Sequence, residues 1–362
     1  MQIIVKEFLK KHHIDDKIIA VGVSGGADSL ALAVWAAENA EECGVKIVAI
    51  TVDHKLRAES TSEAKYVGKI MQNIGIEHHI LTWEGEKPDT GIEEAARIAR
   101  YNLLKNYCFA NGIQSLMVAH HQLDQAETFF MRLQRGSGLD GLCGMSPVSY
   151  YEGLRILRPF LQIPPQKLKD FLNKRKIAWI EDSSNRNEDF LRVKIRNFLP
   201  IFSEKTGIEI EKITKTMETL ARSKAYIDNQ TEKFIKNHCH KIGNIAISAA
   251  QKTLLQTEDE IIYRFLAFAC KTIGEKTYQP RAEDLIRLQE KIKKESFSGC
   301  TLSGCEIFKN QGKIWIIPEN KTLPNPSKKE WEEFLLRNPS FKKQKICGKI
   351  KRILVGICGE NE

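Results

Sequence analysis

The sequence lacks several patterns that define other classes of protein. It contains no Cys-x-x-Cys, and its nine cysteines show no disulfide-like spacing, so we expect neither a standard zinc site nor a disulfide-bonded secreted domain. No apolar run reaches the roughly 20 residues that cross a bilayer. Charged residues also interrupt the first apolar stretch too early for a signal peptide. We therefore expect a cytoplasmic protein with no membrane span.

Acidic residues are too few to balance the basic ones, 46 against 55, which leaves a formal net charge of +9. The surplus is clustered. Residues 155–200 hold 11 basic and 5 acidic side chains, and residues 321–352 hold 10 basic and 3 acidic. Clustered positive charge favours a polyphosphate partner such as RNA. The alternative is a set of solvated lysines that only improves solubility.

In the first half of the chain, short β-branched runs alternate with helical patterns. We expect strands at residues 17–23, 45–52, 78–83 and 115–119, and helices at 29–39, 62–74, 92–103 and from 124. This alternation predicts an α/β fold with a Rossmann-like parallel sheet that helices cover on both faces. Ligands of such sheets bind beyond the carboxyl ends of the strands.

Helical patterns dominate after residue 208 and end in a hairpin that we expect at residues 298–318. The chain therefore divides into three expected parts. They are an α/β domain at 1–208, a smaller, mostly helical domain at 209–322, and a basic C-terminal extension at 323–362.

A candidate phosphate-binding turn follows the first expected strand. It consists of Ser24, Gly25, Gly26, Ala27, Asp28 and Ser29. The glycines let backbone N–H groups approach an anion, and the next helix points its positive end at the same place. The Gly-Lys-Ser/Thr of the usual P-loop is missing, so that motif is excluded. Asp28 would repel phosphate by itself, so we interpret it as a ligand of the Mg²⁺ that neutralises the phosphates.

This hexapeptide resembles the PP-loop of the N-type ATP pyrophosphatases. The resemblance implies a Rossmann-like sheet, ATP as co-substrate, cleavage between its α- and β-phosphates, and an adenylated substrate. A serine-capped turn between strand and helix is the alternative without function.

Six further segments narrow the resemblance: residues 52–60, 94–101, 119–128, 135–139, 158–161 and 181–185. With the PP-loop they are similar to the tRNA(Ile)-lysidine synthetase family, over most of residues 18–200 and more faintly to about 318. The resemblance implies that residues 1–208 form the catalytic ATP-binding domain and residues 209–322 the substrate (tRNA)-binding domain. The resemblance implies that ATP adenylates the C2 oxygen of the wobble cytidine in the CAU anticodon of tRNA(Ile). Free L-lysine would then displace AMP through its ε-amino group and form lysidine.

Asp124 and Glu127 are the candidate residues for lysine binding. They lie three residues apart at an expected helix start, so they share a face and can converge on one cation. A lysine ammonium suits such a pair, and the resemblance places lysine recognition at the same two positions. Together with Asp28 they are the candidate catalytic residues. The alternative is a pair of acids that only stabilises the helix dipole.

Five arginines are candidates for contact with ATP phosphates or tRNA: Arg97, Arg100, Arg135, Arg192 and Arg196. Their planar guanidinium groups suit phosphate better than lysine does. Arg135 lies in a glycine-rich loop, and Arg192 and Arg196 match a two-arginine motif of the family. Arg97 has a structural alternative, because Glu93 precedes it at the spacing of a helical ion pair.

Three positions depart from the family pattern. Leu123 replaces the first of two aspartates that usually follow the histidines, Val193 replaces an asparagine, and Ser183 stands where proline is common. Two other interpretations stay open. The first is a PP-loop tRNA thiolase, against which the missing Cys-x-x-Cys argues. The second is a non-catalytic tRNA-binding relative, against which the intact Ser24–Ser29 turn argues.

Overall fold

The computed structural model describes residues 5–88, 90–181, 191–243, 245–276, 278–319 and 326–337, with residues 348, 351 and 355. The chain divides into two compact units, Met1–Arg222 and Ser223–Glu362. The boundary that the sequence predicts near residue 208 falls between helix α8 (Leu191–Thr206) and helix α9 (Ile210–His238). The division into three functional parts stays a prediction.

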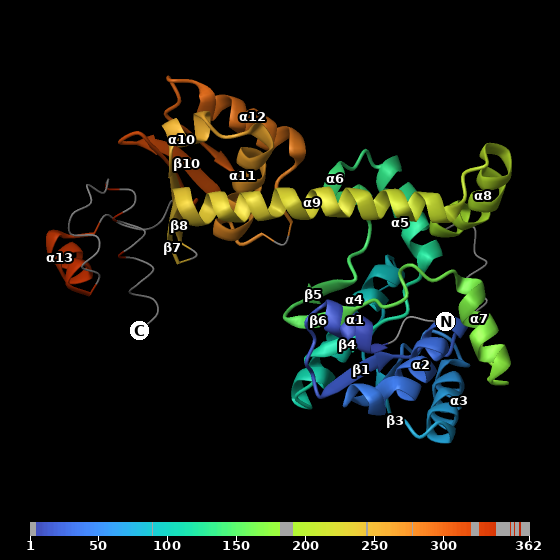
Figure 1. Cartoon of the computed structure of the whole chain (residues 1–362). Coiled ribbons are helices and arrows are strands. Elements are labelled where there is room, and N and C mark those ends of the chain that lie inside the picture. Colours follow the sequence, from blue (N-terminus) through green and yellow to red (C-terminus); the bar gives the residue numbers. More distant parts are fainter. Residues whose placement is uncertain are drawn as a thin grey trace. The chain divides into compact units, whose positions relative to one another are not determined.

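The first unit contains a six-stranded, mostly parallel sheet, as the sequence predicts (Figure 1). Its strand order is β3-β2-β1-β4-β6-β5, and only the edge pair β5–β6 is antiparallel. The strands are β1 (Ile18–Gly22), β2 (Lys46–Asp53), β3 (Glu77–Thr82), β4 (Ser115–Met117), β5 (Val148–Tyr151) and β6 (Leu154–Leu157). The first four match the expected strands. The antiparallel hairpin β5–β6 was not predicted.

The remaining helices of this unit are α1 (Val5–Lys11), α2 (Ala27–Cys43), α3 (Ser60–Asn73), α4 (Ile92–Ala110), α5 (Gln122–Gln134), α6 (Leu139–Leu142) and α7 (Pro165–Lys174). Successive strand residues point to opposite faces of the sheet. Ile19 and Val21 of β1 pack with α2, α3 and α7, whereas Ala20 packs with α4 on the other face. Helices therefore cover both faces, and polar groups gather at the strand ends.

The order of the strands fixes where a ligand can bind. The chain moves outward from β1 through β2 to β3 and then returns to place β4 on the other side of β1. This reversal makes the carboxyl ends of β1 and β4 the switch point of the sheet, where ligands of open α/β sheets bind. The Ser24–Ser29 turn follows β1, and His120–Asp124 follows β4. Both segments therefore start at the switch point.

The second unit packs helices against a five-stranded antiparallel sheet of order β7-β8-β11-β10-β9. Its strands are β7 (Cys239–Ile242), β8 (Ala246–Ala250), β9 (Gly299–Leu302), β10 (Cys305–Asn310) and β11 (Lys313–Pro318). Its helices are α10 (Gln251–Leu255), α11 (Asp259–Ile273), α12 (Ala282–Lys293) and α13 (Lys328–Arg337). The expected helices and the terminal hairpin β10–β11 are present. Strands β7 and β8 were not predicted.

Helix α13 supplies apolar cover to one face of this second sheet. Phe334 is buried in a cluster with Phe308, Trp315 and Ile317, and Trp331 packs against the same cluster. The other face packs against α11 and α12. The described part of the basic C-terminal extension therefore contributes to the core of the second unit.

We expect Phe334→Ala to destabilise the second unit by about 3 kcal/mol, because it leaves a cavity between α13 and the sheet. Leu336→Ala is the matched control on the same helix, since the Leu336 side chain is largely exposed. It should change the free energy of unfolding by less than about 0.5 kcal/mol. Urea unfolding measures both values, and equal effects would show that α13 does not seal this face.

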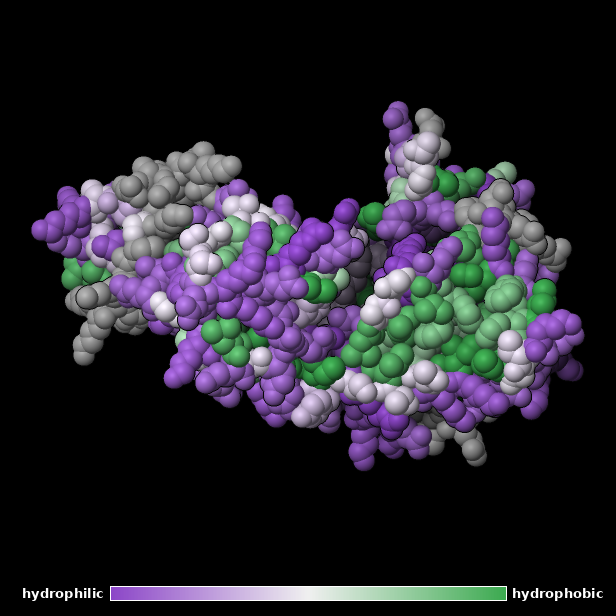
Figure 2. All heavy atoms as spheres, turned by 90° about the horizontal axis from the view of Figure 1, so that it is seen from above, coloured by the Kyte–Doolittle hydropathy of each residue, from purple (hydrophilic) through white to green (hydrophobic). Residues whose placement is uncertain are grey.

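On the face drawn in Figure 2, hydrophobic residues form their largest area in the right-hand part of the picture, and hydrophilic residues cover most of the rest. Among the exposed hydrophobic side chains of the first unit are Leu133 of α5 with Phe198 and Ile201 of α8. Within the described residues, no helix is both long enough and apolar enough to cross a membrane.

Candidate active site

The turn after β1 has the conformation that an anion cradle needs. Gly25 has a φ of +92°, and a Cβ there would lie 2.9 Å from Cδ1 of Ile180 and 3.0 Å from Cγ2 of Val67. Glycine is therefore favoured at this position for two reasons: its φ is positive, and a Cβ atom would come too close to its neighbours. The Ile180 N–H donates to the Gly25 carbonyl at 2.9 Å and fixes the turn against a distant part of the chain.

The two serines of the turn hold it together. The Ser29 hydroxyl donates to the Gly26 carbonyl at 3.0 Å and accepts from the Ser24 N–H at 3.1 Å. The Ser24 hydroxyl lies 3.1 Å from the Ser29 hydroxyl. Within the described chain, the N–H groups of residues 25–28 donate no hydrogen bond. They lie at the N-terminus of α2, so the turn presents unused donors where a phosphate would bind.

Asp28 lies in the first turn of α2 and has one engaged carboxylate oxygen. Its Oδ2 lies 3.5 Å from Nε2 of His121. Its Oδ1 is buried and has no hydrogen-bond partner among the described residues. A buried carboxylate oxygen without a donor is costly unless a cation binds it. Asp28 therefore has an oxygen that could bind a cation, and its assignment to Mg²⁺ stays a prediction.

The segment after β4 begins helix α5 with a reciprocal cap. The Asp124 N–H donates to Nδ1 of His121 at 3.3 Å, and the His121 N–H donates to Oδ2 of Asp124 at 2.8 Å. His121 and Asp124 are both buried. The start of α5 is thus fixed by His121, which also contacts Asp28 of the PP-loop, and by Asp124, one of the two acids of the site.

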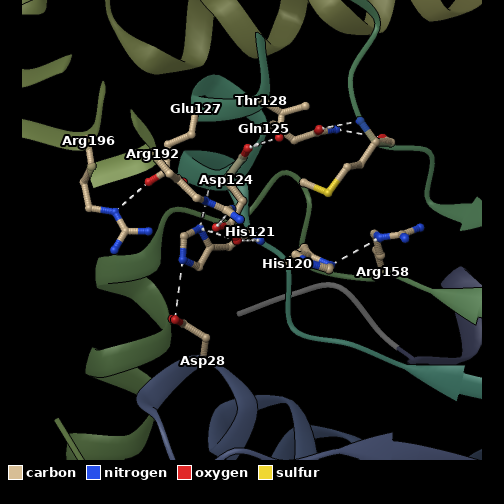
Figure 3. A network of polar contacts seen from close by, with 11 residues as sticks. Asp28, His120, His121, Asp124, Gln125, Glu127, Thr128, Arg158, Arg192 and Arg196 are labelled. Carbon is tan, nitrogen blue, oxygen red and sulfur yellow. Dashed lines mark hydrogen bonds and ion pairs between the residues drawn. The ribbon is translucent and has the colours of Figure 1, made fainter. Parts of the chain in front are cut away.

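Asp124 and Glu127 converge on one cation, but that cation is an arginine of α8 (Figure 3). Nη2 of Arg192 donates to Oδ1 of Asp124 at 2.5 Å, and its Nε donates to Oε2 of Glu127 at 2.5 Å. Nε of Arg196 donates to Oε1 of Glu127 at 2.6 Å. The sequence placed the acids and the arginines in separate roles, whereas the structure joins them.

The network sets the charges of its members. Burial acts to raise the pKa of Asp124, but the positive charges of His121 and Arg192 prevail and lower it, so this carboxylate stays ionised. Burial acts to lower the pKa of His121, but its hydrogen bond to Asp28 and the charge of Asp124 prevail and raise it. The neighbouring His120 differs. Burial, with the charge of Arg158 among others, lowers its pKa to about 4, so it is neutral at pH 7.

Two of the other predicted arginines share a ring. The guanidinium carbons of Arg97 and Arg100 lie 5.4 and 5.6 Å from the centroid of Tyr101. In the described part of the chain, neither they nor Arg135 form an ion pair. Arg135 is exposed at the end of α5, and the structure does not bring it into the network of Figure 3. All three present positive charge without an acidic partner.

Arg158 is a site residue that lies in one of the family-like segments, residues 158–161, but the sequence predicted no role for it. Its Nε donates to Nδ1 of His120 at 3.3 Å, and its Nη1 donates to the Ser146 carbonyl and to the Ser149 hydroxyl. It follows β6, which neighbours β4. The signal that could have identified Arg158 as a site residue is its position, because it is a polar residue just after a strand of the parallel sheet.

The departures from the family pattern have local explanations. Leu123 packs against the apolar cluster between α5 and α8, and Val193 is buried. An apolar residue at each position therefore adds to packing. Ser183, with most of the motif at residues 181–185, lies outside the described residues. In the described part of the chain, no group of three or more His, Cys, Asp or Glu side chains could hold a metal ion.

The amino-acid sequence of this chain matches a known family model and known proteins over most of its length. The family model of the PP-loop domain matches residues 1–202. A tRNA(Ile)-lysidine synthase of Wolbachia pipientis wMel is 37% identical over 314 residues, 84% of this chain and 71% of the relative. One of Ruegeria pomeroyi is 33% identical over 90% of this chain and 77% of the relative.

The fold is also similar to that of the U34-tRNA thiolase NcsA of Methanococcus maripaludis, solved with its [4Fe-4S] cluster. That similarity has a TM-score of 0.50 at 17% identity and covers 60% of this chain and 78% of that one. At this identity the likeness concerns the fold alone.

Proposed function

Because the chain belongs to the tRNA(Ile)-lysidine synthases, a family of PP-loop enzymes, we propose that it forms lysidine in the cytoplasm at the wobble cytidine of tRNA(Ile) with a CAU anticodon. The cytidine O2 attacks the α-phosphorus of ATP, and the bond to the β-phosphate breaks and releases pyrophosphate. The ε-amino nitrogen of free lysine then bonds C2 while the C2–O bond breaks. The ammonium gives one proton to solvent before the attack and a second one after it, and AMP leaves with the oxygen.

The observation that carries this proposal is the direct connection between the PP-loop and the acidic pair. Asp28 contacts His121, His121 and Asp124 cap the same helix, and Arg192 links Asp124 to Glu127. A reaction in which ATP activates one group for attack by an amine needs both reactants within one site. The carboxyl ends of β1 and β4 supply that proximity.

The free oxygen of Asp28 supports binding of Mg²⁺ at the PP-loop. Its Oδ1 is buried without a donor, next to the N–H groups that face the phosphates. A bound Mg²⁺ would neutralise charge on the pyrophosphate leaving group. The N–H groups of residues 25–28 would hold the phosphates from the helix side.

Lysine binding at Asp124 and Glu127 is compatible with their arginine partners. Each ionised carboxylate has about four acceptor positions, and each of these two uses two. The two guanidinium groups balance the two carboxylates, so a lysine ammonium would take the place of Arg192 at the acidic pair. The Arg192 side chain is 42% exposed and can move outward to admit lysine.

Arg97, Arg100 and Arg135 would contact phosphates of the tRNA. They are exposed guanidinium groups with no acidic partner among the described residues. The ring of Tyr101, near which both Arg97 and Arg100 lie, is buried in the core, so the exposed guanidinium groups alone would make the contact.

One assay tests the proposal: the purified protein with ATP, Mg²⁺, labelled lysine and isoleucine tRNA carrying CAU. We expect lysine in the tRNA with AMP released in equal amount. Pyrophosphate release without lysine incorporation would reject lysine as the acceptor but retain adenylation. Incorporation of sulfur from a sulfur donor would instead identify a thiolase. No pyrophosphate release in the presence of tRNA would leave a non-catalytic tRNA-binding protein.

A further inference from the structure

We propose that His121 is a positioning residue that couples the PP-loop to the lysine-binding acids through its two ring nitrogens. This inference rests on the proposed function. It assigns a role to a residue that lies between the PP-loop and the acidic pair Asp124 and Glu127.

The two nitrogens of His121 have different partners. Nδ1 faces Asp124: it lies 3.3 Å from the backbone nitrogen of Asp124, which it caps, and 3.3 Å from Oδ2 of the same residue. Nε2 points at Oδ2 of Asp28, 3.5 Å away, as Figure 3 shows. The ring thus contacts the start of α5 through one nitrogen and the start of α2 through the other. Two helices that follow different strands are held at one separation by a single side chain.

The surroundings of the ring make this bridge rigid. The His121 side chain is 8% exposed, and its backbone N–H is tied to Asp124 as well. His121 is the N-cap of α5, and its backbone is extended at that point. A ring held in this way by the cap and by Asp124 cannot move without Asp124. Any displacement of Asp28 on binding Mg²⁺ and ATP is therefore transmitted to Asp124.

Two substitutions separate the two contacts because each keeps one of them. His121→Asn retains a polar atom near the position of Nδ1, and asparagine is a preferred N-cap residue, so the start of α5 is preserved. Its side chain is too short to reach Asp28. His121→Gln has an amide that reaches toward the position of Nε2 and can donate to Asp28, but it loses the cap.

The measurements are made on the full chain. Calorimetry without tRNA gives the affinity for Mg²⁺·ATP. Pyrophosphate release with tRNA but without lysine gives the rate of adenylation. Lysine incorporation gives KM for lysine. His79→Asn is the matched control, since His79 is half-buried on the edge strand β3 and pairs only with Glu77 among acids in the described chain. It should leave every value unchanged.

We expect His121→Asn to weaken Mg²⁺·ATP binding and adenylation about ten-fold, the lower range for a charge-assisted hydrogen bond, with KM for lysine within two-fold of wild type. His121→Gln should do the reverse: KM for lysine rises about ten-fold while Mg²⁺·ATP affinity stays within about three-fold. A split of this kind supports coupling through the two nitrogens.

Wild-type values in both variants, or equal losses of all values in both, would overturn the proposal. Because His121→Asn keeps the cap, its folding is secured even if the glutamine variant unfolds, and a change in its KM for lysine alone would also overturn the assignment of Nε2. If the wild-type protein incorporates no lysine, the proposed function fails. The calorimetric comparison still tests the contact between His121 and Asp28.

Discussion

Asp28→Asn should reduce tRNA-dependent pyrophosphate release at least about a hundred-fold, the scale on which loss of a single electrostatic contact to a reacting group acts. The substitution keeps the size of the side chain and its position at the start of α2. It removes the negative charge of the carboxylate that we propose as a ligand of Mg²⁺, and an amide oxygen is a much weaker ligand than a carboxylate. Pyrophosphate release in the presence of tRNA measures the effect directly.

The matched control is Glu41→Gln, which removes one negative charge from an exposed position near the other end of the same helix. Its rate should stay within about two-fold of wild type, because an exposed charge is screened within about 10 Å at 0.1 M salt. If added Mg²⁺ restores full activity to the Asp28 variant, weakened ion binding is the cause. Unchanged pyrophosphate release at every Mg²⁺ concentration would reject the role of Asp28.

Glu127→Gln should destabilise the first unit by about 2–3 kcal/mol, the largest effect on stability that we expect in the site. Glu127 is fully buried and accepts from both Arg192 and Arg196. Removing its charge leaves two guanidinium groups facing a neutral amide in a partly buried place, which costs about 3–5 kcal/mol when burial is complete. The arginine side chains are 42% and 33% exposed, so water recovers part of that cost.

Glu38→Gln gives the comparison at the surface. Glu38 also accepts two hydrogen bonds from one arginine, Arg175, at 2.5 and 2.7 Å, but the pair is exposed. Its loss should cost less than about 1 kcal/mol. Urea unfolding of both variants at pH 7 gives the two values. If Glu127→Gln costs no more than Glu38→Gln, the buried network does not stabilise the fold.

Local sequence predicted the parts of the site that depend on local rules. The PP-loop follows from two glycines after an apolar run, and the convergence of Asp124 and Glu127 follows from helical spacing. The partners of those acids could not be predicted in the same way. Arg192 lies 65 residues beyond Glu127, and its distance from α5 is decided by how α8 packs.

Strand β8 shows a second limit. Its sequence, Ala-Ile-Ser-Ala-Ala, contains three alanines, and alanine has the highest helix propensity. It is nevertheless a central strand, because it pairs with β7 and β11 and buries its side chains on the sheet. Tertiary pairing overrides local preference in so short a segment. The five-stranded sheet was missed for this reason, whereas the hairpin β10–β11 carried a glycine turn and alternating apolar residues.

The hydrogen bond between Ile180 and Gly25 has a consequence for the order of events during synthesis. The PP-loop is made well before residue 180, yet its Gly25 carbonyl finds its partner only when residue 180 has left the ribosome. Domains fold as units while the chain emerges at about 5–20 residues per second. A nascent chain therefore carries the motif for many seconds before it has the shape that binds a nucleotide. We therefore expect ATP to be bound and cleaved only after most of the first unit has been synthesised.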